Sequence, residues 1–228
     1  MVSTSGAGQA PRAAFFDVDE TLIRVKSMFD FLRHWMARHG DDGSAFEEEY
    51  AQVRARAASG VDRTEINRDF YRRFAGVREE ALLAGGRAWY EEYRERPDAF
   101  VDSSLRAVAD HRAAGDTVVL VSGSFPGVLR PLAQDIGAHR VLCTEPVADG
   151  SGVLTGEVVR PMIGANKALG TAEVMAELGV DPAGCFAYGD HSSDLEMLLL
   201  VGNPRVIGAD PVLSAHAERG GWPVLSAA

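Results

Sequence analysis

The stretch Ala13-Ala14-Phe15-Phe16-Asp17-Val18-Asp19-Glu20-Thr21 decides the fold. Its first four residues are all apolar, and the polar residues that follow end the run abruptly. Short apolar runs bounded by polar turns are typical of parallel strands buried on both faces. Asp17 and Asp19 stand two residues apart just beyond this run, so in extended backbone their side chains point to the same side. The stretch therefore predicts a buried strand that ends in a pair of carboxylates.

Four further apolar runs of this kind recur along the chain, over residues 117–121, 141–143, 185–188 and 205–207. Helical patterns separate most of them, over residues 103–114, 126–136, 167–178 and 193–200. Strands that alternate with helices predict an α/β fold: a Rossmann-like, mostly parallel, five-stranded sheet flanked by helices. Ligands of such folds bind at the carboxyl ends of the strands, where Asp17 and Asp19 lie.

Residues 27–98 break this alternation, because they contain several helical stretches and no convincing strand. Apolar residues recur there at helical spacing, beginning with Met28, Phe29 and Leu32. We predict a helical cap over 27–98, inserted after the first strand at the ligand-binding edge. Residues 12–26 and 99–228 then form the catalytic core. A cap hinged near Val25 and Phe100 is expected to open and close over the site.

Two smaller segments depart from the alternation of strands and helices. Residues 1–11 are rich in Gly, Ser and Ala, and we expect a disordered tail there. Asp149-Gly150-Ser151-Gly152 precedes a β-like run, which predicts a hairpin within residues 145–161.

The composition excludes several classes of protein. The 228 residues carry a formal net charge of −10, which argues against nucleic acid or an anionic membrane as the main partner. Cys143 and Cys185, the only cysteines, lie within apolar runs and are expected to be buried free thiols. No apolar run approaches the roughly 18 residues of a membrane-spanning helix, and no signal peptide is recognisable. We therefore expect a soluble, cytoplasmic protein, whose oligomeric state the sequence does not decide.

Polar side chains also follow two of the other predicted strands and open one helix. Ser122 and Gly123 follow the second run, where a hydroxyl and an accessible backbone N–H offer donors to an oxyanion. Asp190 and Asp194 follow the fourth run, and Lys167 opens a helix at the end where the dipole disfavours a cation. The structural alternatives are an ordinary turn serine and helix-capping aspartates. Together, these groups suit Mg²⁺ and a phosphoryl group.

Taken in order, these residues resemble the four motifs of the haloacid dehalogenase (HAD) superfamily, and most closely its phosphoserine-phosphatase-like subgroup. The motifs are Asp17-Val18-Asp19-Glu20-Thr21, Ser122, Lys167 and Gly189-Asp190-His191-Ser192-Ser193-Asp194. The resemblance extends from Ala13 into the region of Trp222-Pro223. It implies a Mg²⁺-dependent phosphatase that hydrolyses a small organic phosphate ester through an aspartyl-phosphate intermediate.

The resemblance also implies a role for each motif residue. Asp17 is expected to be the nucleophile and Asp19 the general acid and base. An acid at the position of Asp19 favours phosphatase chemistry over carbon–halogen cleavage. The expected phosphate-binding residues are Thr21, Ser122, Gly123 and Lys167. The expected metal ligands are Asp17, the backbone carbonyl of Asp19, and Asp190, with Asp194 supporting the metal site from behind.

The sequence departs from phosphoserine phosphatases at the position nine residues after the nucleophile. Those enzymes place a glutamate there that meets the substrate amine, whereas this chain has Lys26. Ser193 likewise replaces an asparagine of the last motif. A cation near the substrate amine repels it, so we predict that phosphoserine is a poor substrate. The alternative is that Lys26 points to solvent and has no effect.

Other residues of the predicted cap are candidates for contacts with the substrate. Phe29 and Arg33, together with Tyr71 and Arg72, are further candidates for the cleft, although periodicity does not tell which of them face it.

Two other functions remain open on the same scaffold. A phosphotransferase or mutase would use the same residues with an acceptor other than water. A non-catalytic phosphate-binding module is disfavoured because both Asp17 and Asp19 are present. Receiver domains combine similar residues, but in a different order and in about half the length.

Overall fold

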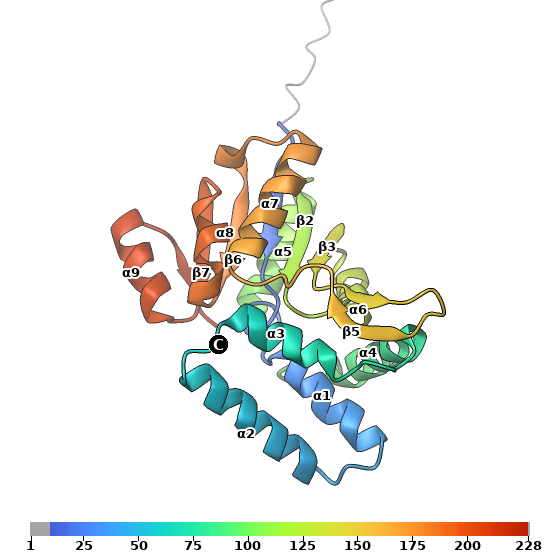
Figure 1. The fold of residues 1–228 in the computed structure, drawn as a ribbon. Helices are drawn as coiled ribbons and strands as arrows, with labels where there is room; N and C mark the ends of the chain where they lie inside the picture. Colours follow the sequence, from blue (N-terminus) through green and yellow to red (C-terminus); the bar gives the residue numbers. More distant parts are fainter. Residues whose placement is uncertain (1–9, 228) are drawn as a thin grey trace, which may run out of the picture.

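The computed structural model describes residues 10–227. Most of the tail expected over 1–11 therefore lies outside the described residues. A six-stranded, all-parallel sheet forms the centre, in the order β3-β2-β1-β6-β7-β8 (Figure 1). Its strands are Ala13–Phe16 (β1), Thr117–Ser122 (β2), Arg140–Cys143 (β3), Phe186–Gly189 (β6), Asn203–Ile207 (β7) and Val224–Leu225 (β8).

The five predicted strands are all present, and the α/β fold with a mostly parallel sheet is confirmed. The expected number of strands was one too few, because β8 has only two residues and pairs with β7 alone. From β1 the chain proceeds to β2 and β3 on one side, and it later returns to β6 on the other. The strand order thus reverses at β1, and the carboxyl ends of strands at such a switch point are where α/β folds bind ligands.

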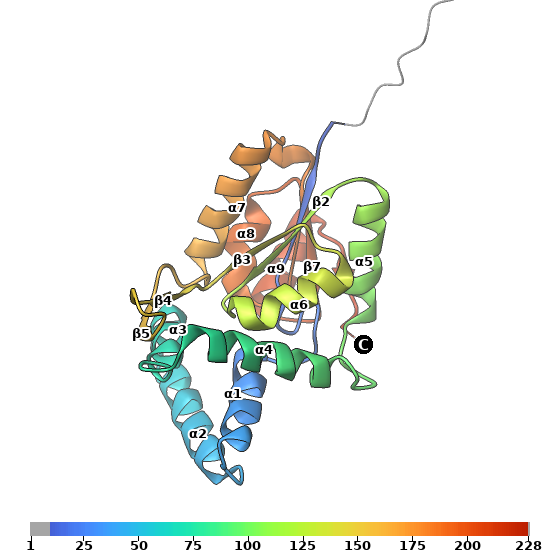
Figure 2. The same cartoon turned by 90° about the vertical axis from the view of Figure 1, so that its right-hand side faces the viewer.

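Helices cover both faces of the sheet, which Figure 2 shows nearly edge-on. Successive residues of a strand point to opposite faces. Ala14 and Phe16 accordingly pack in one apolar cluster, and Ala13 and Phe15 in another. The first cluster includes residues of α5 (Asp102–Ala113) and α6 (Pro126–Ile136). The second includes residues of α7 (Ala165–Leu178), α8 (Leu195–Leu199) and α9 (Pro211–Gly220).

Four helices between β1 and α5 lie beyond the carboxyl ends of the central strands (Figure 1). They are α1 (Ser27–Arg38), α2 (Ser44–Ala58), α3 (Arg63–Arg72) and α4 (Glu79–Tyr93), and no strand occurs among the residues 27–93. Their buried aromatic side chains, among them Phe31, Phe70 and Trp89, belong to the same cluster as the face of the sheet that holds Phe16. The inserted helices therefore share one apolar core with the sheet.

The contact between α4 and α6 depends on glycine. A Cβ atom on Gly86 of α4 would lie 2.6 Å from the carbonyl carbon of Gly127 in α6. Real Cβ atoms do not approach backbone this closely, so any larger residue at position 86 would push the two helices apart.

The predicted hairpin is also present, as the antiparallel strands β4 (Pro146–Ala148) and β5 (Leu154–Val158). It contacts the end of α3: the N–H of Gly76 donates to the carbonyl of Leu154 at 2.8 Å. Gly156 within β5 has a φ of 85° and packs close to Ala75, so this position in the strand needs glycine. The hairpin thereby supports α3 next to the sheet.

Both cysteines are free and buried, as expected. Within residues 10–227, no helix combines the length and the apolar character that crossing a membrane requires.

Candidate active site

The end of β1 and the loop after it bring Asp17 and Thr21 to the switch point of the sheet. The N–H of Asp17 donates to the carbonyl of Tyr188 at 3.0 Å, so the residue continues the pairing of β1 with β6. Glu20 has a φ of 62°, which is uncommon for a residue with a side chain, and the chain turns sharply there. This turn buries Thr21, whose Oγ1 lies 2.8 Å from Asp190 Oδ1 and 3.3 Å from Asp17 Oδ2.

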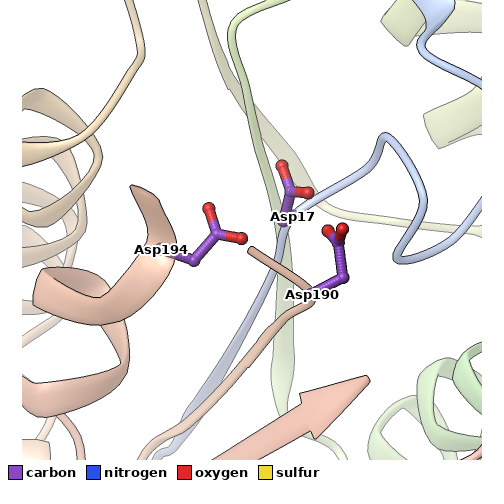
Figure 3. Close-up of side chains that lie close together, drawn as sticks. All are labelled: Asp17, Asp190 and Asp194. Atoms are coloured by element: carbon purple, nitrogen blue, oxygen red, sulfur yellow. The ribbon is translucent and has the colours of Figure 1, made fainter. Parts of the chain in front are cut away.

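Three carboxylates and one lysine meet beyond the sheet. Figure 3 shows Asp17, Asp190 and Asp194 approaching one another from the end of β1, the loop after β6, and the short 3-10 helix Ser192–Asp194. One carboxylate oxygen from each lies within 4.8 Å of the others. The buried Nζ of Lys167 pairs with Asp17 and, at 2.7 Å, with Asp194 Oδ1. Among the described residues, Lys167 alone forms an ion pair with these carboxylates, so the cluster keeps an excess of negative charge.

This excess charge and the burial change the pKa values of the cluster. Burial, together with the charge of Asp17, raises the pKa of Asp190 to about 9. The same two causes raise the pKa of Asp19 to about 7. Burial also raises the pKa of Asp194. Burial by itself would lower the pKa of Lys167, but the charges of Asp17 and Asp194 outweigh it and raise that pKa.

These residues fit a hard divalent cation. Oxygen ligands from a few carboxylates are what Mg²⁺ takes from proteins, and Asp17, Asp190 and Asp194 offer three within reach of one another. Asp19 Oδ1 is buried without a hydrogen-bond partner in the described structure, which leaves it available to a bound group. A divalent cation would offset the repulsion that now favours protonated carboxylates.

We expect the metal-free protein to lose stability as the pH rises. Carboxyl groups with raised pKa values keep their protons in the folded state while the unfolded chain releases them, so rising pH favours unfolding between about pH 4 and about pH 9. In EDTA, the free energy of unfolding in urea should be roughly 2 kcal/mol or more lower at pH 8 than at pH 5.5. Saturating Mg²⁺ should flatten this dependence, and so should Asp190→Asn without metal. If the free energy of unfolding in EDTA does not change with pH, the predicted loss of stability is wrong.

The predicted phosphate-binding loop after β2 is held by an inserted helix. Ser122 is buried, and its Oγ accepts the N–H of Ser124 at 3.1 Å. The carbonyl of Gly123 accepts two hydrogen bonds from α3, from Asn67 Nδ2 at 2.9 Å and Tyr71 Oη at 2.8 Å. The sequence interpretation missed Asn67 and named Tyr71 only as one candidate for the cleft. In the structure Tyr71 is buried and does not line the cavity. Asn67 and Tyr71 are four residues apart, so they lie on the same face of α3. This spacing was the one signal in the sequence that could have paired Asn67 with Tyr71.

A cavity of about 430 Å³ connects this cluster with the inserted helices. It is lined by most of the predicted site residues, namely Asp17, Asp19, Ser122, Gly123, Lys167, Asp190 and Asp194. Thr21 lies beneath them, bonded to two of the carboxylates. Sequence reasoning gave no role to Glu20, Arg54, Arg63 or His191, which also line it.

Some of the candidate specificity residues line the cavity and others do not. Lys26 and Phe29 line the cavity, and Lys26 Nζ lies 3.4 Å from a carboxylate oxygen of Glu20. Arg33 lies in a neighbouring depression and pairs with Glu47 at 3.0 Å. Arg72 pairs with Asp69 at the surface. Arg33 and Arg72 therefore have no place in the substrate site proposed below.

A comparison with protein families agrees with this geometry. The family model of haloacid dehalogenase-like hydrolases matches residues 14–199. The chain belongs to this family. The match includes every motif residue of this HAD hydrolase from Asp17 to Asp194, and it includes the inserted helices.

Relatives of this HAD hydrolase include named phosphatases. A probable phosphatase of Mycobacterium tuberculosis is 32% identical over 226 residues, 96% of this chain and 77% of the relative. An inhibition of morphological differentiation protein of Streptomyces azureus is 31% identical over 224 residues, 93% of this chain and 77% of the relative. Relatives named phosphoserine phosphatase also match, at identities of 28% to 30%.

Solved structures share the fold. A Bordetella pertussis protein of unknown function superposes with a TM-score of 0.82 at 25% identity, over 96% of this chain and 100% of that chain. A phosphoserine phosphatase bound to an analogue of its phospho-aspartyl intermediate reaches a TM-score of 0.68 at 16% identity, over 96% of this chain and 95% of that chain. The HAD fold thus extends over almost the whole length of the chain.

Proposed function

We propose that this HAD phosphatase is a Mg²⁺-dependent phosphomonoester hydrolase that acts on a small organic phosphate through an aspartyl-phosphate on Asp17. The observation that carries the proposal is the position of the Asp17 carboxylate. It lies at the switch point of the sheet, paired with the buried Lys167, in a cavity that also holds Asp19. Family membership and the relatives named phosphatase support the same reaction class.

The reaction has two steps at one phosphorus atom. A carboxylate oxygen of Asp17 attacks the phosphorus, the bond from phosphorus to the ester oxygen breaks, and Asp19 gives its proton to the departing alkoxide. Water then attacks the phosphorus of the aspartyl-phosphate and Asp19 takes its proton, which releases inorganic phosphate and free Asp17. A pKa of Asp19 near 7 suits a group that must both give and take a proton near neutral pH.

The surrounding residues hold the charged groups in place. Lys167, the Ser122 hydroxyl and the Gly123 N–H would bind phosphoryl oxygens, and Thr21 would be the fourth phosphate-binding residue. Asp17, Asp190 and the backbone carbonyl of Asp19 would hold Mg²⁺, with Asp194 steadying the site through Lys167. When bound, Mg²⁺ lets an anionic nucleophile approach an anionic phosphate.

We also propose that phosphoserine is disfavoured, although some relatives carry the name phosphoserine phosphatase. Besides Lys167 and the aspartates, the lining of the cavity contains three cations, Lys26, Arg54 and Arg63, against the single carboxylate of Glu20. That balance repels the ammonium group of phosphoserine.

Phosphate release from a broad panel of phosphomonoesters tests both proposals. We expect release in Mg²⁺, loss of release in EDTA, and phosphoserine ranked below esters that carry no amine. Phosphoserine ranked first would refute the specificity proposal and leave the reaction class standing. Product analysis with added alcohols separates hydrolysis from phosphotransfer, because a transferase would form a new ester instead of free phosphate.

A further inference from the structure

The cavity continues beyond the space that a phosphoryl group needs. A volume of about 430 Å³ lies within the range of sites for small organic ligands, roughly 300–1,000 Å³. Away from the aspartates, its wall is mostly apolar and comes from the inserted helices and the loop between α2 and α3. The apolar lining includes Met28, Phe29, Val53, Ala57, Val61 and Ile66. Such a wall favours a ligand whose organic part is apolar.

Two arginines interrupt this wall. Arg54 comes from α2, and Arg63 is the first residue of α3. Neither forms an ion pair with a carboxylate of residues 10–227. Other arginines of the inserted helices do form such pairs, for example Arg56 with Asp69 and Arg73 with Glu49. The charges of Arg54 and Arg63 are therefore uncompensated where a ligand would lie.

The neighbours of both arginines leave their donors available. The guanidinium carbon of Arg54 lies 5.2 Å from the centre of the Tyr50 ring, and no hydrogen bond from Arg54 to another residue of 10–227 accompanies this contact. Arg63 Nη1 lies 3.0 Å and 2.9 Å from the two ring nitrogens of His191. His191 Nδ1 already accepts the Ser193 N–H at 3.0 Å, so the ring engages at most one of the five N–H groups of Arg63.

We propose that the substrate is a phosphomonoester with an apolar body and a second anionic group, and that Arg54 and Arg63 bind this second group. The inference rests on the proposed function, since it takes the phosphoryl group to lie at Asp17. The apolar body would then lie along the inserted helices. Guanidinium groups bind carboxylates and phosphates through paired hydrogen bonds, which gives them selectivity for such ends. Lys26 contributes less, because Glu20 already offsets its charge.

Binding to an inactive variant tests this inference without turnover. In Asp17→Asn with Mg²⁺, calorimetry would compare three series of straight-chain phosphate esters of four to eight carbons. Their far ends are a methyl group, a carboxylate and an ammonium group. At the best chain length, we expect the carboxylate ester to bind about tenfold more tightly than the methyl ester, because charge-assisted hydrogen bonds to guanidinium groups are among the stronger ones in proteins. The ammonium ester should bind most weakly.

Removing each arginine in the Asp17→Asn background should abolish the preference. Arg63→Gln and Arg54→Gln should each lower the ratio of carboxylate-ester to methyl-ester affinity at least threefold, and the double variant should bring it near one. Arg87→Gln is the matched control, since Arg87 is exposed on α4 and does not line the cavity. Arg63→Lys keeps the positive charge, so it should retain part of the preference for the carboxylate ester. This variant shows whether the effect of Arg63→Gln comes from the lost charge or from a change in structure.

The outcomes separate this inference from the proposed function. Equal binding of the three esters, or a carboxylate preference that survives in the double variant, would overturn the inference even if the wild-type protein releases phosphate. A preference that disappears in the double variant would support it. Failure of the proposed function is a different result, namely no phosphate release by the wild-type protein from any of the three series.

Discussion

Asp17→Asn should lower phosphate release by roughly 10,000-fold or more, because the amide cannot form the acyl-phosphate bond. The variant should still fold. Lys167 keeps its pairing with Asp194, and the amide removes one of the charges that repel each other in the cluster. Turnover of the best panel substrate measures the loss, and thermal unfolding checks the fold.

Asp98→Asn is the matched control for this substitution. Asp98 is exposed and does not line the cavity, so both activity and stability should stay near those of the wild-type protein. If Asp17→Asn retains more than about one per cent of the activity, another residue is the nucleophile and the proposed mechanism is wrong.

Lys167→Met should produce the largest change in stability. The substitution leaves Asp17 and Asp194 without the one described side chain that forms ion pairs with them, next to the third carboxylate, Asp190. Removal of one partner from a buried ion pair destabilises proteins by about 3–5 kcal/mol. Urea unfolding in EDTA should show a loss of this size, and Mg²⁺ should restore part of it by supplying the missing positive charge. Activity should fall as well, because Lys167 is placed to bind the phosphoryl group.

Lys26→Met offers a close comparison, because Lys26 and Lys167 are the only lysines of the chain. Lys26 is 43% exposed and pairs with an exposed Glu20, so its loss should change the free energy of unfolding by less than about 1 kcal/mol. Equal stability of Lys167→Met and the wild-type protein in EDTA would show that the carboxylates do not depend on the lysine charge.

Much of the fold could be predicted because its signals are local. Four apolar residues before Asp17 define β1, and four consecutive residues typical of turns, 149–152, predict the turn of the hairpin. The clustering of the candidate site residues could be predicted because each follows a strand or opens a helix, and the topology of a parallel sheet brings such positions together. The two-residue β8 gave no comparable signal, because its pairing depends on β7 and not on its own pattern.

The unpredicted features of the site depend on contacts between distant segments. Asn67 and Tyr71 donate to Gly123, more than 50 residues further along the chain, and Arg63 meets His191 across an even longer separation. Periodicity identified α3 as a helix but did not show which core element its polar residues would meet. Sequence reasoning named Arg33 as a candidate and gave Arg63 no role, because only the folded arrangement shows that Arg63 lines the cavity and Arg33 does not.

The glycine contact between α4 and α6 also bears on how a substrate enters. Gly86 brings α4 against the backbone of Gly127 in α6, and α3 is bonded to Gly123 just after β2, so both helices are held closely against the core. Helix α2 buries only Phe46, and it is joined to its neighbours by ion pairs such as Arg33 with Glu47 and Arg73 with Glu49. We therefore expect access to the aspartates to depend on the tilting of this one helix, and the rate of entry and release to be set by the residues that join α2 to its neighbours.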